Sequence, residues 1–213
     1  MRCFYEMYPA VVENRQQPVD DMEKEGRVMI WFISDTHFNH DKKFIYGPRG
    51  FHSVQEADST IIKNWNDAIG RDDDVYMLGD FFLGTDYDFI TNTINSLNGK
   101  IHLVIGNHDT PAKVEFYKKF DNIVEIAWAM QIEYNKRQFY LSHYPTQTAD
   151  LNSDPKTCVF NIYGHVHSRE KFYEDRPYMY CAALDAQDNK PVSIEQVCKE
   201  IQDEIRDCIR FLV

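Results

Sequence analysis

The feature that most constrains this chain is a pattern repeated five times, in which a short apolar run ends directly in Asp, Asn or His. The five segments are Met29 to His37, Val75 to Asp80, Ile101 to Asp109, Phe139 to His143 and Val159 to His167. Short runs that are rich in branched and aromatic residues predict buried strands. In open α/β sheets, ligands bind at the carboxyl ends of the strands. The pattern therefore predicts a site at which several strand ends meet.

The segments between the first strands predict helices. Ser53 and Glu56 form a capping box that opens a helix ending near Gly70. A second helix is expected over residues 85–97. A third begins at Pro111, because proline suits the first position of a helix. The first half of the chain therefore alternates strand and helix.

The second half of the chain is richer in strands. They are expected over residues 123–132, 138–141, 159–163 and 178–183, and a closing helix begins at Ser193. An alternating first half followed by a strand-rich second half favours an α/β fold in which two β-sheets pack together and helices flank them.

Length and charge limit the organisation and the partners of the chain. Its 213 residues fit one domain, which we assign to residues 29–213, with residues 1–28 as an N-terminal extension. The formal net charge of −11 disfavours strong binding to duplex nucleic acid, which depends on clustered Lys and Arg. A small phosphorylated ligand remains compatible with this charge, because a bound cation can invert the local field.

Cysteine usage and hydropathy predict a cytoplasmic protein. The chain has five cysteines, an odd number, and no CxxC pair, which favours reduced thiols. No apolar stretch approaches the ~18 residues that a membrane helix needs. The amino terminus also lacks the basic and apolar regions of a signal peptide. We therefore expect no association with a membrane.

The first two motifs place metal-binding groups at strand ends. Asp35 and His37 are two residues apart, so in extended backbone both point to the same side. Asp80 follows Gly79, which lets the backbone turn tightly and brings the carboxylate close. Each motif has an ordinary alternative: an Asp-x-His pair occurs often by chance, and Asp80 could simply cap the next turn.

The segment after the central strand is more specific. Asn107 offers a neutral carbonyl oxygen. His108 could act as a general acid, because histidine side chains exchange protons near neutral pH, and Asp109 could orient its imidazole. The alternative is a polar turn that caps the following helix, but this does not account for a histidine at position 108.

Three further histidines complete the set. His143 lies at a strand end, where a single histidine is usually structural. His165 and His167 are two residues apart after a glycine, which is typical of a metal pair, with a surface turn as the alternative. Asp, Asn and His ligands without a thiolate suit Mn, Fe, Zn or Ni. The full set exceeds the ligands of one zinc ion and matches two cations that share a carboxylate.

In this order, the motifs resemble those of the calcineurin-like metallophosphoesterases. The matching segments are Asp35-x-His37, Gly79-Asp80, Gly106-Asn107-His108-Asp109, His143 and Gly164-His165-x-His167. The resemblance spans residues 29 to about 185 and extends to a small bacterial and phage branch of the family. It implies a four-layer sandwich of two mixed β-sheets flanked by helices, and a phosphoester hydrolase that depends on metal.

The resemblance also implies a role for each residue. One cation would take Asp35, His37, Asp80 and His167, and the other would take Asp80, Asn107, His143 and His165. Manganese is the first expectation for both cations, with Fe, Zn or Ni as alternatives. A hydroxide activated by the two cations would attack a small phosphomonoester, phosphodiester or pyrophosphate in line. His108 would stabilise or protonate the leaving oxygen, and Asp109 would hold His108.

Two other functions are open at this point. Some proteins of this fold are interaction scaffolds without activity, and others are nucleases. The complete set of ligand types argues against a scaffold, and the absence of a basic stripe argues against a nuclease.

Other polar residues carry weaker expectations. His40 could approach the site, although a position facing solvent is favoured. Arg49 and Arg169 could clamp a phosphate, but ordinary surface positions are favoured for both. Asp185 is expected in a turn or behind a metal ligand, and His102 in the core or on a sheet face.

Overall fold

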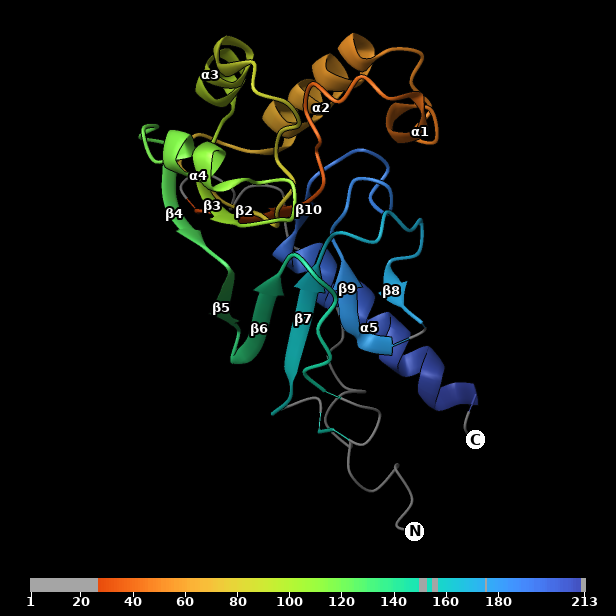
Figure 1. The fold of residues 1–213 in the computed structure, drawn as a ribbon. Helices are drawn as coiled ribbons and strands as arrows, with labels where there is room; N and C mark the ends of the chain where they lie inside the picture. The colour runs from red at the N-terminus through yellow and green to blue at the C-terminus, as the bar shows by residue number, and fades with distance from the viewer. Residues whose placement is uncertain (1–26, 150–152, 155–156, 175, 212–213) are drawn as a thin grey trace.

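The computed structural model describes residues 27–149, 153–154, 157–174 and 176–211. The extension predicted over residues 1–28 therefore lies almost entirely outside the described residues. Two mixed sheets of five strands each form the body of the molecule, and helices flank them (Figure 1). This arrangement confirms the predicted α/β fold class.

The first sheet contains most of the amino-terminal half, with strand order β10-β1-β2-β3-β4. Its strands are β1 (Ile30–Ile33), β2 (Asp74–Met77), β3 (Lys100–Val104), β4 (Ile123–Ala127) and β10 (Val192–Ser193). The first four run parallel, and β10 is antiparallel to β1. The helices of this half are α1 (Lys43–Tyr46), α2 (Val54–Ala68), α3 (Tyr87–Ser96) and α4 (Pro111–Tyr117). The cap at Ser53 and the proline at the start of α4 are confirmed.

The second sheet has strand order β5-β6-β7-β9-β8. Its strands are β5 (Ala129–Tyr134), β6 (Arg137–Ser142), β7 (Val159–Tyr163), β8 (Phe172–Tyr173) and β9 (Arg176–Cys181). Strands β6, β7 and β9 are parallel, whereas the two edge strands are antiparallel to their neighbours. The closing helix α5 (Ile194–Phe211) follows β10 and lies beside this sheet (Figure 1).

The single strand predicted over residues 123–132 is wrong. The chain leaves the first sheet after β4, and Trp128, which is 77% exposed, separates this strand from β5 in the second sheet. A pattern of alternating apolar residues predicts extended backbone, but it does not show where the chain passes from one sheet to another. In the hairpin turn after β5, Asn135 and Lys136 have φ of 50° and 64°, as a tight turn requires.

Buried side chains form two large apolar layers. Phe32 and Ile33 are neighbours on β1, so they point to opposite faces. Ile33 packs with Trp65 of α2 under the helices, while Phe32 packs with Phe139 of the second sheet. Val197 of α5 joins the layer between the sheets. Because the inner strands are covered on both faces, polar side chains are left to gather at the strand ends.

No helix among the described residues is both long and apolar enough to cross a lipid bilayer. Cys158, Cys181 and Cys198 are free thiols, as predicted for these positions.

Candidate metal centre

The carboxyl ends of strands from both sheets meet in one place. A parallel bridge between Ser34, after β1, and Ala183, after β9, joins the two edges. The predicted ligands follow strands of the first sheet (Asp35, His37, Asp80 and Asn107) and of the second (His143, His165 and His167). Donor atoms of all seven residues lie within 4 Å of a donor atom of another member. The predicted convergence of strand ends is therefore present.

The backbone is strained where these side chains leave the strands. Positive φ angles occur at Asp35 (56°), His37 (46°), Asp80 (56°), His165 (73°) and His167 (47°). Residues other than glycine rarely adopt this left-handed conformation, which costs of the order of 1 kcal/mol or more. Such strain clusters at functional sites, and here it turns each side chain toward a common centre.

Two motif glycines leave the space that this convergence needs. Gly79 has φ of 93°, and a Cβ at this position would lie 2.5 Å from Nδ1 of His143. A Cβ at Gly164 would collide with the Asp35 carboxylate. Any larger residue at either position would therefore push a ligand candidate away from the centre.

A first group of donors comprises Asp35, His37 and His167. The Nε2 atoms of His37 and His167 are 3.1 Å apart, and Oδ1 of Asp35 lies 3.8 and 3.6 Å from them. Nδ1 of His167 faces the Asp185 carboxylate at 3.0 Å, so a neutral ring has its proton on Nδ1 and its lone pair on Nε2. Burial lowers the pKa of His37 to about 2, which keeps that ring neutral. Oδ1 of Asp35 is buried without a hydrogen-bond partner.

A second group comprises Asn107, His143 and His165. Nδ1 of His143 donates to the Leu78 carbonyl at 2.8 Å, so in a neutral ring Nε2 carries the lone pair. This Nε2 lies 2.9 Å from Oδ1 of Asn107 and 3.2 Å from Nδ1 of His165. In a neutral ring, Nε2 of His143 and Oδ1 of Asn107 are therefore two acceptors that face each other.

Asp80 lies between the two groups. Its Oδ1 accepts a hydrogen bond from the His108 amide at 2.8 Å. Its Oδ2 lies 3.7 Å from Nε2 of His37, in the first group, and 3.6 Å from Nε2 of His143, in the second. A single carboxylate oxygen therefore faces both groups.

The donor set fits divalent metal. Ligands at about 2.1 Å from one ion are separated by roughly 3.0–3.4 Å, close to the spacings found here. Two trios, Asp35 with His37 and His167 and Asp35 with Asp80 and His143, each have donor atoms within 4.8 Å of one another. Burial raises the pKa of Asp35, and a neighbouring cation would favour its carboxylate form. Converging lone pairs and an unpartnered buried oxygen are the arrangement that a cation would relieve.

His108 lies at the rim of the centre. Its side chain is 45% exposed, and Nε2 is 3.9 Å from Oδ2 of Asp80. Behind it, the buried amine of Lys113 donates to the carbonyls of His108 and Phe82 at 3.0 and 2.7 Å. Sequence reasoning missed Lys113, because a lysine in the first turns of an amphipathic helix is usually exposed.

The predicted role of Asp109 is wrong. Its carboxylate does not hold the His108 ring but accepts hydrogen bonds from the amides of Asp80 (2.8 Å), Gly106 (2.9 Å) and Phe81 (3.3 Å). The turns after β2 and β3 leave these N–H groups buried and without strand partners, so they need an acceptor. Asp109 therefore fixes the backbone that carries Asp80.

Four more polar residues can be placed. His40 does not face solvent as expected, since it is 9% exposed and its ring lies 5.5 Å from that of His37. Arg49 is buried, whereas Arg169 is on the surface and donates to a backbone carbonyl. His102 lies on a sheet face, stacked on Tyr76 as well as facing two carboxylates.

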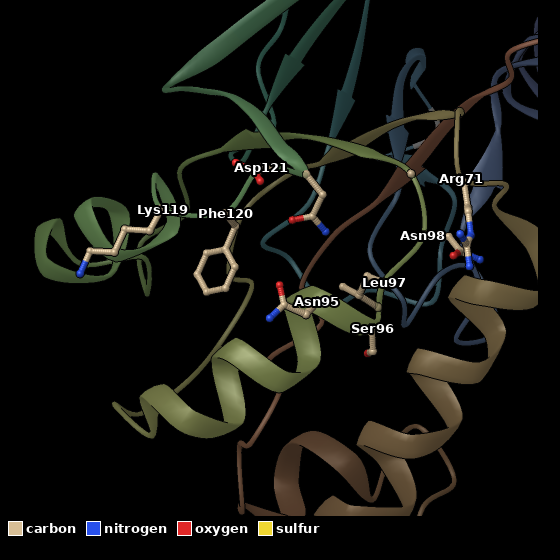
Figure 2. A pocket seen from close by; sticks show the side chains of 10 residues that line it. Arg71, Asn95, Ser96, Leu97, Asn98, Lys119, Phe120 and Asp121 are labelled. Carbon is tan, nitrogen blue, oxygen red and sulfur yellow. The ribbon is translucent and has the colours of Figure 1, made fainter.

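A hollow of about 640 Å³ lies at the opposite, amino-terminal edge of the first sheet (Figure 2). Its asparagines serve the fold, since the amides of Asn98 and Asn122 donate to the carbonyls of Ile69 and Ile94. Arg71 and Lys119 lie at opposite sides of the hollow and do not converge (Figure 2). The strand-end centre, and not this hollow, collects the groups that can perform chemistry.

Residues 28–181 match the sequence profile described as the calcineurin-like phosphoesterase superfamily domain. This chain belongs to the calcineurin-like phosphoesterases. The family resemblance drawn from the motifs is thereby confirmed, and it makes metal-dependent hydrolysis of phosphoesters the general chemistry of this calcineurin-like phosphoesterase.

Relatives come from an archaeon and from phages. An uncharacterized protein of Methanocaldococcus jannaschii is 34% identical over 178 residues, which cover 81% of this chain and 91% of that protein. The gene 66 protein of Mycobacterium phage L5 is 36% identical over 161 residues, with coverage of 65% and 77%. Among solved structures, a protein of unknown function from Aquifex aeolicus superposes with a TM-score of 0.61 at 27% identity, covering 81% of this chain and 99% of that one.

Proposed function

We propose that this calcineurin-like phosphoesterase hydrolyses a small phosphomonoester, phosphodiester or pyrophosphate with two divalent cations. The observation that carries the proposal is the position of Asp80. Its Oδ2 lies at nearly equal distances from a histidine nitrogen of each donor group. A shared carboxylate oxygen is what two adjacent cations require.

The two donor groups give each cation its own ligands. Asp35, His37 and His167 would hold one cation, and Asn107, His143 and His165 would hold the other, with Asp80 common to both. When bound, such a pair supplies an activated water as nucleophile and neutralises charge on the phosphoryl group. Manganese is the first candidate, because oxygen and imidazole ligands without thiolate suit it, and Fe, Zn and Ni are alternatives.

The side chains at the rim supply the remaining chemistry. His108 is exposed enough to meet a substrate and close enough to Asp80 to stand beside the reacting phosphorus. As an imidazolium it can protonate or stabilise the departing oxygen. Asp109 contributes indirectly, because its hydrogen bonds to the backbone set the direction of Asp80.

The charge of the protein favours a small substrate. A net charge of −11 repels long polyanions, whereas the local charge of two cations attracts a single phosphate group. A small phosphorylated molecule in the cytoplasm is therefore the substrate class that we propose, without a role for duplex nucleic acid or a membrane.

A chromogenic assay tests this function. Metal-free protein should release no nitrophenol from mono- or bis-nitrophenyl phosphate, and added Mn²⁺ should restore turnover of at least one of them. Folded protein that turns over neither ester with Mn²⁺, Fe²⁺, Zn²⁺ or Ni²⁺ would contradict the proposal and favour an interaction scaffold. Faster digestion of single-stranded DNA or RNA than of either small ester would favour a nuclease.

A further inference from the structure

Arg49 and Asp185 form a buried ion pair directly behind one donor group. Nη2 and Nε of Arg49 donate to the two carboxylate oxygens of Asp185 at 2.7 and 3.2 Å. The Arg49 side chain is 2% exposed and that of Asp185 is 11% exposed. A pair so deeply buried must satisfy nearly all its hydrogen bonds within the protein.

The carboxylate of this pair also holds a proposed metal ligand. Oδ2 of Asp185, which accepts from Arg49, faces Nδ1 of His167 at 3.0 Å. This contact fixes the proton on Nδ1 and turns Nε2 toward the centre. A carboxylate behind a metal-binding histidine also raises the basicity of the ring and so its affinity for metal.

The guanidinium reaches the other ligands of the same group. Nη2 of Arg49 donates to the Asp35 carbonyl at 2.8 Å, and Nη1 approaches the Thr36 carbonyl at 3.5 Å. These carbonyls belong to the strained turn that carries Asp35 and His37. With its N–H groups occupied in this way, Arg49 is not available to clamp a substrate phosphate.

The second donor group has different supports. His143 is held by the Leu78 carbonyl, and the amide of His165 donates to Oδ2 of Asp35. Asn107 follows β3, which lies on the far side of β2 from β1 in the first sheet. The contacts of Arg49 and Asp185 therefore fall on one side of the centre.

We propose that Arg49 and Asp185 are positioning residues that set the metal affinity of the Asp35–His37–His167 group and leave the Asn107–His143–His165 group largely unaffected. This inference rests on the proposed two-metal function. The contacts of Arg49 and Asp185 join four loops, which lie between β1 and α1, between α1 and α2, between β7 and β8, and between β9 and β10.

Calorimetric titration of the metal-free full chain with MnCl₂ tests the inference. The wild type should bind two ions. The Asp185→Asn variant keeps the shape of the side chain but loses its charge, so one site should weaken by about 10–100-fold while the other keeps its affinity. The Arg49→Lys variant keeps the positive charge but loses the planar guanidinium that donates to both Asp185 oxygens. It should weaken the same site by a smaller factor.

Asp73→Asn is the matched control. Asp73 is also buried and accepts from Met29, Trp31 and Gly70, but it lies at the opposite edge of the sheet. This variant should melt at a lower temperature and still bind two ions with wild-type affinity. The control separates a general loss of stability from a loss at one metal site.

Three outcomes are decisive. Wild-type affinity at both sites in Asp185→Asn would overturn the inference, and so would equal weakening of both sites. If Asp185→Asn fails to fold, the same criteria apply to Arg49→Lys. A wild-type chain that binds no manganese, zinc, iron or nickel would instead contradict the proposed function, so the two failures are distinguishable.

Discussion

Two imidazole rings of the centre lie unusually close together. Nε2 of His37 and Nε2 of His167 are 3.1 Å apart, and Nδ1 of His167 faces the Asp185 carboxylate on the other side of the ring. Both histidines have positive φ angles, which shows that the fold imposes this close approach.

His108 is the residue whose loss should separate chemistry from metal binding. The His108→Ala variant removes an acid at the rim but none of the proposed ligands. We expect unchanged metal content by elemental analysis and a turnover at least ~100-fold lower, the usual effect of losing acid or oxyanion assistance. Loss of metal in this variant would show that His108 is a ligand instead.

Substitution of Asp80 should, in contrast, weaken the binding of both cations. In Asp80→Asn the shared oxygen becomes neutral, so both cations lose an anionic ligand. Elemental analysis after dialysis should therefore show depletion at both sites, and Asp109→Asn should deplete them less, since Asp109 acts only through the backbone. Full occupancy in Asp80→Asn would contradict the shared position of this carboxylate.

Sequence reasoning identified the side chains that converge but not those that hold them in place. Asp35, Asp80 and His143 were predictable because each ends an apolar run. Lys113 and Arg49 were not predictable, because burial of a charged group depends on contacts between distant segments. The role of Asp109 was mistaken for the same reason.

At the scale of elements, the ends of the parallel strands and helix α2 position the residues of the centre. Parallel strands bring their carboxyl ends to one edge, so order along the chain was enough to predict the meeting of β1, β2 and β3. The split of residues 123–132 into β4 and β5 was not predictable, because sheet membership leaves no local pattern. Neither was α1, which has only four residues.

Asp58 of helix α2 accepts a hydrogen bond from the loop after β1. Asp58 is 7% exposed, and its carboxylate accepts a hydrogen bond from the amide of Asn39 at 3.1 Å. Burial raises the pKa of Asp58 to about 6, against 3.8 for the unperturbed group. The folded chain therefore binds this proton more tightly than the unfolded chain. The resulting stabilisation is present below about pH 4 and is lost as the pH rises through about 6.

Asp58→Asn should remove this dependence on pH. The amide keeps an oxygen that can accept from Asn39 but cannot ionise. Urea unfolding of metal-free protein should show the variant to be about as stable as the wild type near pH ~4 and more stable near pH ~7.5. An equal difference between the two proteins at both pH values would show that the Asp58 carboxylate does not carry this linkage.

At the scale of the whole molecule, the centre connects the two sheets. Asp35, His37, Asp80 and Asn107 follow strands of one sheet, and His143, His165 and His167 follow strands of the other. The sheets already share a buried apolar layer. A cation held by both would add a further connection that the unfolded chain lacks.

Metal should therefore stabilise the fold. For one site at 100 times its dissociation constant, the gain is about 2.7 kcal/mol, or roughly 5–10 °C in melting temperature for a chain of this size. Calorimetric melting with Mn²⁺ and after chelation measures the shift. The His143→Ala variant should show a smaller shift than the wild type, whereas equal melting temperatures with and without metal would argue against a centre that spans the sheets.

The position of Asp80 between two cations is the central claim, and anomalous diffraction from crystals grown with Mn²⁺ tests it most directly. We predict two anomalous peaks, one beside His37 and His167 and one beside Asn107 and His143, with the Asp80 carboxylate coordinating both. A single peak, or two peaks of which one lies beyond the reach of Asp80, would contradict the account.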